Sequence, residues 1–336
     1  MIGSKVESDN SHHNFRFSNL INIQIMSRHD HISHVGLSID TDNLKPLFKT
    51  NYLRHTGDIV LNWIIITLII VICISYFSLP LYLFGVIIIG ARMHALAILM
   101  HDATHFRFLK NKYWNDLITN IVTMYPIFTS IAKYRQNHLN HHRHLNTDDD
   151  PDWAAKLGKR AFTFPKSKME FILSLLSYFF LYQGVMDAIW LLKRLSQNDN
   201  APGSDSREKF VKLGFYFSMA IVLTITNSWL LFLLYWIIPY MSTFFMFQYI
   251  RSVAEHFGEL DYDHELSSTR TVKATLVEQF FIAPHNVGFH LEHHLFPGVP
   301  YYNLPKLHNT LWADRQFRNK AHITNGYVKG LLNELG

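Results

Sequence analysis

Histidine is gathered in a few short segments of this sequence, and imidazole is a side chain that binds transition metals. Three segments read HDATH (101–105), HLNHH (138–142) and HLEHH (290–294), and a fourth, RSVAEH, ends at residue 256. Histidines three or four residues apart share one face of a helix, so each segment is expected to direct its imidazoles to one point. The nine histidines are His101, His105, His138, His141, His142, His256, His290, His293 and His294.

Nine converging imidazoles are too many for a single metal ion. A protein zinc site uses three or four side-chain ligands, so nine suit two metal ions with four or five ligands each. Imidazole binds iron, copper, zinc and nickel, and the ligand type alone leaves the metal open. The chain has one cysteine, Cys73, which excludes a disulfide framework, a thiolate zinc site and a protein-ligated iron–sulfur cluster.

Acidic residues next to the histidine clusters are candidates to accept hydrogen bonds from the imidazoles. A metal-binding imidazole usually donates its other N–H to a carboxylate or carbonyl, which fixes its tautomer and orientation. Asp102, Glu255 and Glu292 each lie beside a clustered histidine, and the run DDDPDW follows HLNHH. From that run, Asp149 and Asp152 are the expected partners, although a solvated helix cap explains the same residues.

The elements that must position these histidines are apolar enough for a membrane. Hydrophobic residues make up 49% of the chain and charged residues 17%, and a helix needs about 20 apolar residues to cross a bilayer. Four stretches meet this requirement, at residues 59–77, 81–100, 210–227 and 229–250. The short turns SLP and TNS join them in pairs, so the stretches predict two helical hairpins.

The distribution of charge sets the expected orientation. The net charge of +5 would suit nucleic acid, but bunched apolar runs favour a membrane and no nucleic acid. No Lys or Arg lies within residues 61–91 or 213–250, and segments rich in these residues stay on the cytoplasmic side. We therefore expect residues 101–209, residues 251–336 and both termini on that side. The predicted fold is all-α, with four transmembrane helices in two hairpins, interfacial helices and a cytoplasmic histidine-rich cap.

Two further stretches need separate treatment. Residues 169–192 are long enough to span, but Gln183 and Asp187 interrupt them, and a fifth crossing would put the basic residues that follow on the wrong side. We expect an interfacial or re-entrant helix pair there. Residues 1–50 are polar, with no apolar signal-peptide core. They are expected to form a disordered extension, which leaves residues 51–336 as the membrane domain.

The order and spacing of the motifs resemble the integral-membrane fatty acid desaturase superfamily. HxxxH, then HxxHH, then a late HxxHH followed by LFPGVP match the histidine boxes of that superfamily. RSVAEHFG, TRTV and APHNVGFHLEHHLFPGVPYYNLPKLH are similar to its fatty acid desaturase branch. The resemblance covers about residues 50–325 in order and spacing, which makes it specific.

The resemblance implies a non-haem di-iron centre held by the nine clustered histidines, with O2 as co-substrate and a fatty acyl chain as substrate. His256 lies where the family varies most, and Asn286 is implied to position a ligand or a water. The third box begins with His290, where front-end desaturases typically have glutamine. The chain has no HPGG haem motif and no cysteine cluster, so the resemblance implies a separate electron donor of ferredoxin or cytochrome b5 type.

Other interpretations of the same residues stay open. A hydroxylase or a carotenoid or lipid ketolase shares the site and the first hydrogen removal, although HLEHHLFPGVP favours the desaturase. A metal transporter or other metal-binding membrane protein would place ligands within its spans, whereas here the outer turns carry no histidine. A zinc hydrolase of the HExxH kind is disfavoured because Asp102 stands where that motif has its general-base glutamate.

Overall fold

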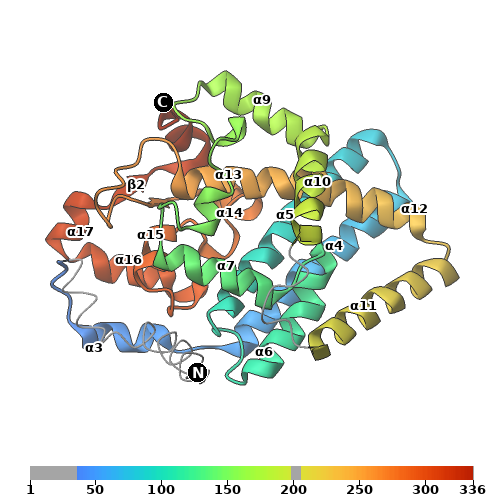
Figure 1. The fold of residues 1–336 in the computed structure, drawn as a ribbon, viewed down its shortest axis with the longest axis horizontal. Helices are drawn as coiled ribbons and strands as arrows, with labels where there is room; N and C mark the ends of the chain where they lie inside the picture. The colour runs from blue at the N-terminus through green and yellow to red at the C-terminus, as the bar shows by residue number, and fades with distance from the viewer. Residues whose placement is uncertain (1–35, 198–205, 336) are drawn as a thin grey trace, which may run out of the picture.

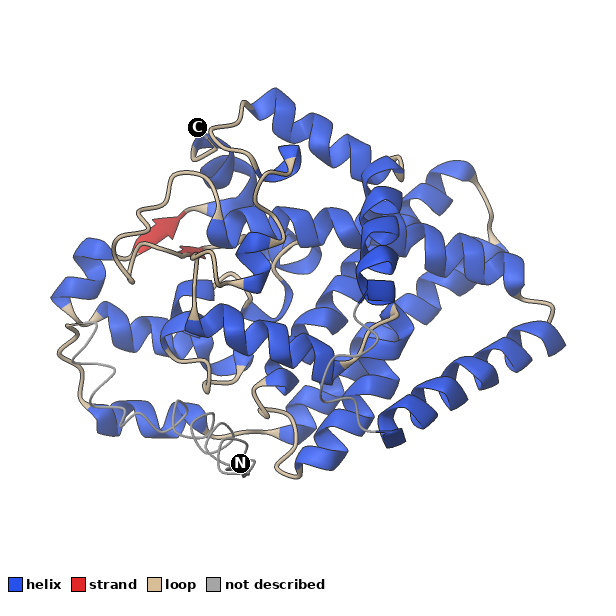
Figure 2. Ribbon diagram, viewed as in Figure 1, coloured by secondary structure: helices blue, strands red, loops and turns tan. Residues whose placement is uncertain are grey.

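The computed structural model describes residues 36–197 and 206–335, which are mostly helical (Figures 1 and 2). The first helices are α3 (Thr41–Leu44), α4 (Tyr52–Ser75), α5 (Leu79–Thr104), α6 (Lys112–Thr119), α7 (Ile131–Arg143), α8 (Pro151–Ala154), α9 (Lys168–Phe179) and α10 (Tyr182–Gln197). They are followed by α11 (Ser206–Ile225), α12 (Trp229–Phe232), α13 (Phe245–His256), α14 (Leu276–Phe281), α15 (His290–Leu295), α16 (Leu304–Trp312) and α17 (Arg315–Lys320), with two strands, β1 (Arg270–Val272) and β2 (His322–Thr324).

Three helices are long and apolar enough to cross a membrane: α4, α5 and the helix Trp229–His256. Helices α4 and α5 pack against each other across a short connection. Apolar side chains of α4 such as Leu61 and Leu68 are exposed, whereas every residue from Ile89 to Thr104 in α5 is buried. Helix α5 is therefore central, and α4 presents an apolar face at the periphery.

A glycine allows a second helix to approach α5 closely. A Cβ atom on Gly90 would lie 2.0 Å from Thr243 Oγ1 and 2.7 Å from the backbone nitrogen of Phe244. The Thr243 hydroxyl donates a hydrogen bond to the Val86 carbonyl at 2.7 Å. The segment Tyr240–Phe244 is π-helical, a local widening of the helix that often occurs at functional sites. This contact fixes α13 along α5, and both helices end in clustered histidines.

The remaining apolar stretches agree in part with the predicted spans. The stretch 229–250 lies within the apolar helix Trp229–His256. Helix α11 covers most of the stretch 210–227 but is not among the three apolar helices. It lies at the edge of the molecule (Figure 1), where Tyr216 donates a hydrogen bond to the Tyr125 carbonyl at 3.0 Å. Its crossing stays a prediction. For residues 169–192, where we expected a helix pair, α9 and the first half of α10 are bent by 72°.

Most of the extension predicted for residues 1–50 lies outside the described residues, which begin at residue 36. The described part differs from a disordered extension. Helix α3 and the 3-10 turn Lys45–Phe48 pack on the core through the buried side chains of Leu44 and Leu47. Two buried leucines in a polar segment give no periodic pattern. The packing of this segment on the core therefore could not be predicted from its composition.

Two short strands are an addition to the all-α expectation. Strands β1 and β2 pair in parallel, with Arg270 opposite His322. The Arg270 side chain is fully buried, where it donates to the Phe257 carbonyl at 2.7 Å and pairs with Glu334 at 3.2 Å. Strand β1 also contacts α13 and α15. The strands thus hold the C-terminal segment against two helices that carry clustered histidines (Figure 1).

Candidate metal centre

The nine clustered histidines lie in two groups of ring nitrogens, and within each group the nitrogens are within 4.8 Å of one another. The first group is His101, His105, His138, His142 and His293. The second group is His141, His256, His290 and His294. Helices α5, α7 and α15 supply the first group, with His105 at the end of α5, and α7, α13 and α15 supply the second. The division into five and four donors is the one expected for two metal ions.

Helices α7 and α15 each serve both groups, which places the groups side by side. In α7, His138 and His142 belong to the first group, and His141 belongs to the second. The ring centroids of His142 and His294, which belong to different groups, are 4.3 Å apart. The two groups of donors therefore adjoin each other and are compatible with two neighbouring metal ions.

The contacts among the ring nitrogens fit bound cations. Nε2 of His138 lies 2.9 Å from Nε2 of His105 and 3.0 Å from Nε2 of His142. A neutral imidazole has one N–H only, so His138 cannot donate to both neighbours. Nε2 of His101 is buried and has no hydrogen-bond partner among the described residues. In the second group, Nε2 of His290 is 2.9 Å from two other Nε2 atoms.

Burial keeps these imidazoles in the form that binds metal. Desolvation, followed by repulsion from neighbouring imidazoles, holds the pKa of His138 and His293 well below the usual 6.5. Burial likewise lowers the pKa of His105 to about 3. The rings are therefore neutral near pH 7 and offer lone pairs. Converging lone pairs of neutral imidazoles are a donor set for a transition-metal ion, so the site is compatible with metal binding.

Two carboxylates contact the outer nitrogens of the second group. Asp150 is buried and accepts a hydrogen bond from Nδ1 of His141 at 2.8 Å. Oε1 of Glu255 lies 3.3 Å from Nδ1 of His290 and 2.6 Å from Nε of Arg251. A proton held on Nδ1 leaves Nε2 free to coordinate. The hydrogen bond to Asp150 orients the His141 ring and selects this tautomer, whereas Glu255 lies near Nδ1 of His290 without a hydrogen bond to it.

Of the six residues predicted to support the ligands, Glu255 contacts a clustered histidine. Asp102 instead accepts the backbone N–H of Tyr301 at 3.1 Å, and Glu292 pairs with His308 at 2.5 Å. Consecutive residues on a helix point in different directions. A carboxylate next to a ligand in sequence is therefore turned away from the metal that this ligand faces.

The other three predicted supporting residues also lie elsewhere. Asn286 donates to the Tyr301 carbonyl at 3.1 Å, Asp149 is exposed, and Asp152 pairs with Lys156 at 2.5 Å. The member of the DDDPDW run that contacts a clustered histidine is Asp150, rather than Asp149 or Asp152, which were singled out from that run. A signal for it was present, because Asp150 precedes a proline and caps α8, which is a favoured arrangement at a helix start.

A cavity of about 10 Å³ adjoins both groups and is lined by His101, His290, His293, His285 and Tyr301, among others. This volume is close to that of one water molecule. His285 and the residue after it have φ angles of 54° and 58°, a left-handed conformation that is uncommon for residues other than glycine. The turn brings the His285 ring against Asn62, whose Nδ2 is 3.1 Å from Nε2 of His285. The buried site thus has room beside the ring nitrogens for a small molecule.

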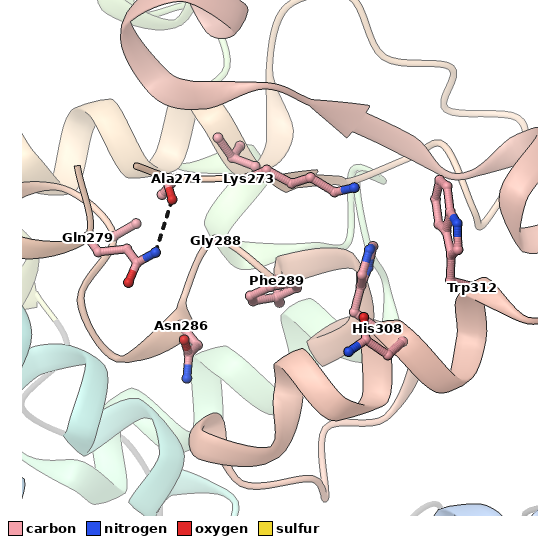
Figure 3. Close-up of a pocket in the computed structure, with 11 residues that line it drawn as sticks. Lys273, Ala274, Gln279, Asn286, Gly288, Phe289, His308 and Trp312 are labelled. Carbon is pink, nitrogen blue, oxygen red and sulfur yellow. Dashed lines mark hydrogen bonds between the residues drawn. The ribbon is translucent and has the colours of Figure 1, made fainter. Parts of the chain in front are cut away.

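A larger pocket of about 370 Å³ lies between the segment after β1, α14 and α16 (Figure 3). Its polar side chains are Lys273, Gln279, Asn286, His308 and Asn309. Of these, His308 reaches the third histidine segment through its contact with Glu292. The pocket is therefore linked to the metal-binding groups, although sequence patterns did not indicate it.

The chain matches the family model described as “Fatty acid desaturase” over residues 77–325, a range that contains all nine clustered histidines. The chain belongs to this family. The predicted resemblance is thereby confirmed, as is the predicted class of enzyme, because desaturases are oxidoreductases. The family is membrane-bound, in agreement with the three apolar helices of this desaturase.

Several characterised desaturases are similar to this one. It is 28% identical over 277 residues to dihydrorhizobitoxine desaturase of Bradyrhizobium elkanii, an alignment that covers 77% of this chain and 75% of that protein. It is 23% identical to an sn-1 acyl-lipid omega-3 desaturase (ferredoxin) of Nostoc, over 65% of this chain and 63% of that one. An sn-1 oleoyl-lipid 12-desaturase of Anabaena variabilis is 22% identical, with 73% and 75% covered.

Proposed function

We propose that this desaturase uses O2 to introduce a double bond into a fatty acyl chain at a di-iron centre. The observation that carries the proposal is the division of nine clustered imidazoles into adjacent groups of five and four. The first group would hold one iron ion and the second group the other. Bound iron supplies the oxidising power that removal of hydrogen from an unactivated C–H bond requires. The balanced reaction consumes one O2, two electrons and two protons, and it yields the alkene and two waters.

The residues of the chain orient the ligands and exclude water. Asp150 holds His141 by a hydrogen bond at its outer nitrogen, and the Glu255 carboxylate lies 3.3 Å from the outer nitrogen of His290. Most of the ligand side chains are buried, so charge at the site is little screened by solvent. The small cavity beside His101 has room for about one water molecule. Such a closed site suits chemistry in which stray water would intercept a reactive species.

We further propose that four helices span the membrane and that the histidines lie on its cytoplasmic side, as do both termini. Helices α4, α5, α11 and the helix Trp229–His256 would be the spans, and the bent pair α9–α10 would lie at the interface. The proposal is supported by the lack of Lys and Arg in residues 61–91 and 213–250. The exposed apolar face of α4 suits contact with lipid.

The substrate class and the electron donor follow from the relatives and the composition. The relative from Nostoc is named an acyl-lipid desaturase with ferredoxin in its name, and the relative from Anabaena is named an oleoyl-lipid desaturase. The present chain has one cysteine, too few to ligate its own iron–sulfur cluster. We therefore propose an acyl-lipid as substrate and a separate ferredoxin or cytochrome b5 type protein as electron donor. The relative from Bradyrhizobium is named for a different substrate, so substrate identity needs direct measurement.

The test is mass spectrometry of total lipids from an aerated host that expresses the full chain. Wild type is compared with His141→Ala and with His264→Ala, a matched control at an exposed histidine outside both groups. A product lighter than its precursor by two hydrogen atoms, present in wild type and control but absent in His141→Ala, is expected. A product heavier by one oxygen atom would make the protein a hydroxylase. Purified protein without iron would overturn the di-iron assignment.

A further inference from the structure

Lys273, His308 and Trp312 meet on one side of the 370 Å³ pocket (Figure 3). Nζ of Lys273 lies 4.9 Å from the centroid of the Trp312 ring. The Trp312 side chain is 38% exposed, and Lys273 is exposed as well. Arg318 donates hydrogen bonds to the Trp312 and Ala313 carbonyls at 2.9 and 3.0 Å. Exposed Trp and Arg side chains are typical of a protein-binding surface, where both residue types are enriched.

The surface around this tryptophan is basic. Helices α16 and α17 contain no Asp or Glu. Their charged side chains are four exposed cations, Lys306, Arg315, Arg318 and Lys320. The acidic residue between the two helices, Asp314, is turned inward and accepts three backbone N–H groups at 2.7 to 3.0 Å. None of the described residues that line the pocket is acidic. Such a surface attracts and orients an acidic partner.

A series of contacts leads inward from Trp312 to Glu292, the residue that precedes His293 in the chain. The rings of Trp312 and His308 are stacked, with centroids 5.5 Å apart. Nδ1 of His308 then donates to Oε1 of Glu292 at 2.5 Å. Glu292 is fully buried and precedes His293, a member of the first group. A buried carboxylate is costly unless it is paired, and the pairing of Glu292 is directed to His308 rather than to a clustered histidine.

We propose that Trp312 and Lys273 form the docking surface for a small acidic one-electron carrier, and that electrons enter through Trp312, His308 and Glu292. The inference rests on the proposed function, since a desaturase of this kind needs electrons from outside. Each docked carrier is oxidised by one electron and the metal centre is reduced by one, with no bond formed between the proteins. Two such transfers accompany each double bond. The pocket beside Trp312 is large enough to receive an acidic side chain of the carrier.

The experiment uses the full iron-loaded chain and a reduced plant-type ferredoxin, regenerated by its reductase and NADPH. Product formation is measured against ferredoxin concentration for wild type, Lys273→Glu, Trp312→Ala and the control Lys168→Glu. Lys168 is exposed on α9, away from the pocket, and takes the same change of charge. We expect Lys273→Glu to raise the KM for ferredoxin about tenfold with little change in kcat, and to weaken its salt dependence. Trp312→Ala is expected to lower kcat about tenfold.

A second measurement separates this inference from the proposed function. Each variant is reduced chemically with dithionite and methyl viologen, which need no docking surface, and is then mixed with O2 for a single turnover. Equal product from wild type and Lys273→Glu in this assay, together with the ferredoxin defect, supports the docking surface. Ferredoxin kinetics of both pocket variants within twofold of Lys168→Glu would overturn it. No product from chemically reduced wild type would instead overturn the proposed function.

Discussion

His141 donates the hydrogen on its Nδ1 to Asp150 at 2.8 Å, and both side chains are buried although they come from α7 and from the cap of α8. Because Nδ1 of His141 is bound to Asp150, Nε2 is the nitrogen left to face the other three histidines of the second group. Asp150 also caps α8 through the backbone N–H of Asp152 at 2.8 Å. One carboxylate therefore couples the fold of a surface turn to the orientation of a metal-binding ring.

Replacement of Asp150 tests that coupling. We expect Asp150→Asn to weaken iron binding about 10- to 100-fold, because loss of a carboxylate that holds a ligand histidine has an effect of that size. The measurement is iron retained per chain during dialysis against a graded chelator. The exposed neighbour in Asp149→Asn undergoes the same chemical change and should bind iron as wild type does. Equal iron loss in both variants would argue against a role for the His141 contact.

The two groups should lose metal separately. His256 belongs to the second group alone, and its removal leaves that group with three donors and the first group with all five. We expect His256→Ala to retain about half of the wild-type iron, measured by elemental analysis of protein purified in detergent. His264→Ala should retain all of it. Full iron content in His256→Ala would show that this histidine, the least typical position for the family, is not a ligand.

Acid should destabilise the metal-free chain. The pKa of His105 is lowered to about 3 by burial, and burial also holds the pKa of His138 and His293 well below 6.5. Below about pH 6.5 the unfolded chain binds protons that the folded chain does not, so the free energy of unfolding falls as pH falls. The thermal midpoint of the metal-free chain in detergent should therefore drop steadily between about pH 7 and pH 5. A midpoint that stays constant or rises on acidification would contradict this account of the buried imidazoles.

Two glycine substitutions should act in opposite directions. Gly90→Ala places a Cβ 2.0 Å from Thr243 Oγ1, and overpacking of this kind typically costs about 1–3 kcal/mol. Gly57→Ala in α4 meets no described atom within 4 Å, and alanine is favoured over glycine in a helix by about 0.5–1 kcal/mol. Thermal midpoints should fall for the first variant and stay level or rise for the second. Equal midpoints would mean that the helix containing Thr243 packs less closely on α5 than the structure shows.

Features that depend on residues close together in the sequence could be predicted from local patterns. The spacing HxxHH predicts that His290, His293 and His294 lie on one helix, and all three lie on α15. The expectation that one segment directs its imidazoles to one point was wrong, because His290 and His294 belong to the second group and His293 to the first. Apolar length predicts α4, α5 and the helix ending at His256. Both signals depend on residues a few positions apart, and the physical period of the helix relates them directly.

Tertiary contacts could not be predicted from local sequence patterns. Sequence adjacency suggested that Glu292 supports a ligand, whereas its partners are Thr271 and His308, at 2.6 and 2.5 Å. The choice of Asp150 over Asp149 depends on how the turn after α7 packs. The pairing of β1 with β2 joins segments about fifty residues apart, and three-residue strands leave almost no periodic signal.

The clustered histidines come from four helices that are far apart in the sequence. This arrangement has a consequence for the order of synthesis, folding and metal binding. The second group draws on α7, α13 and α15, and its last nitrogen belongs to His294 in a chain of 336 residues. A ribosome must therefore have made nearly the whole polypeptide, and the apolar helices must have come together, before either group is complete. We therefore expect metal delivery to be a late step of biogenesis, and we expect a chain that ends before α15 to bind no metal at either group.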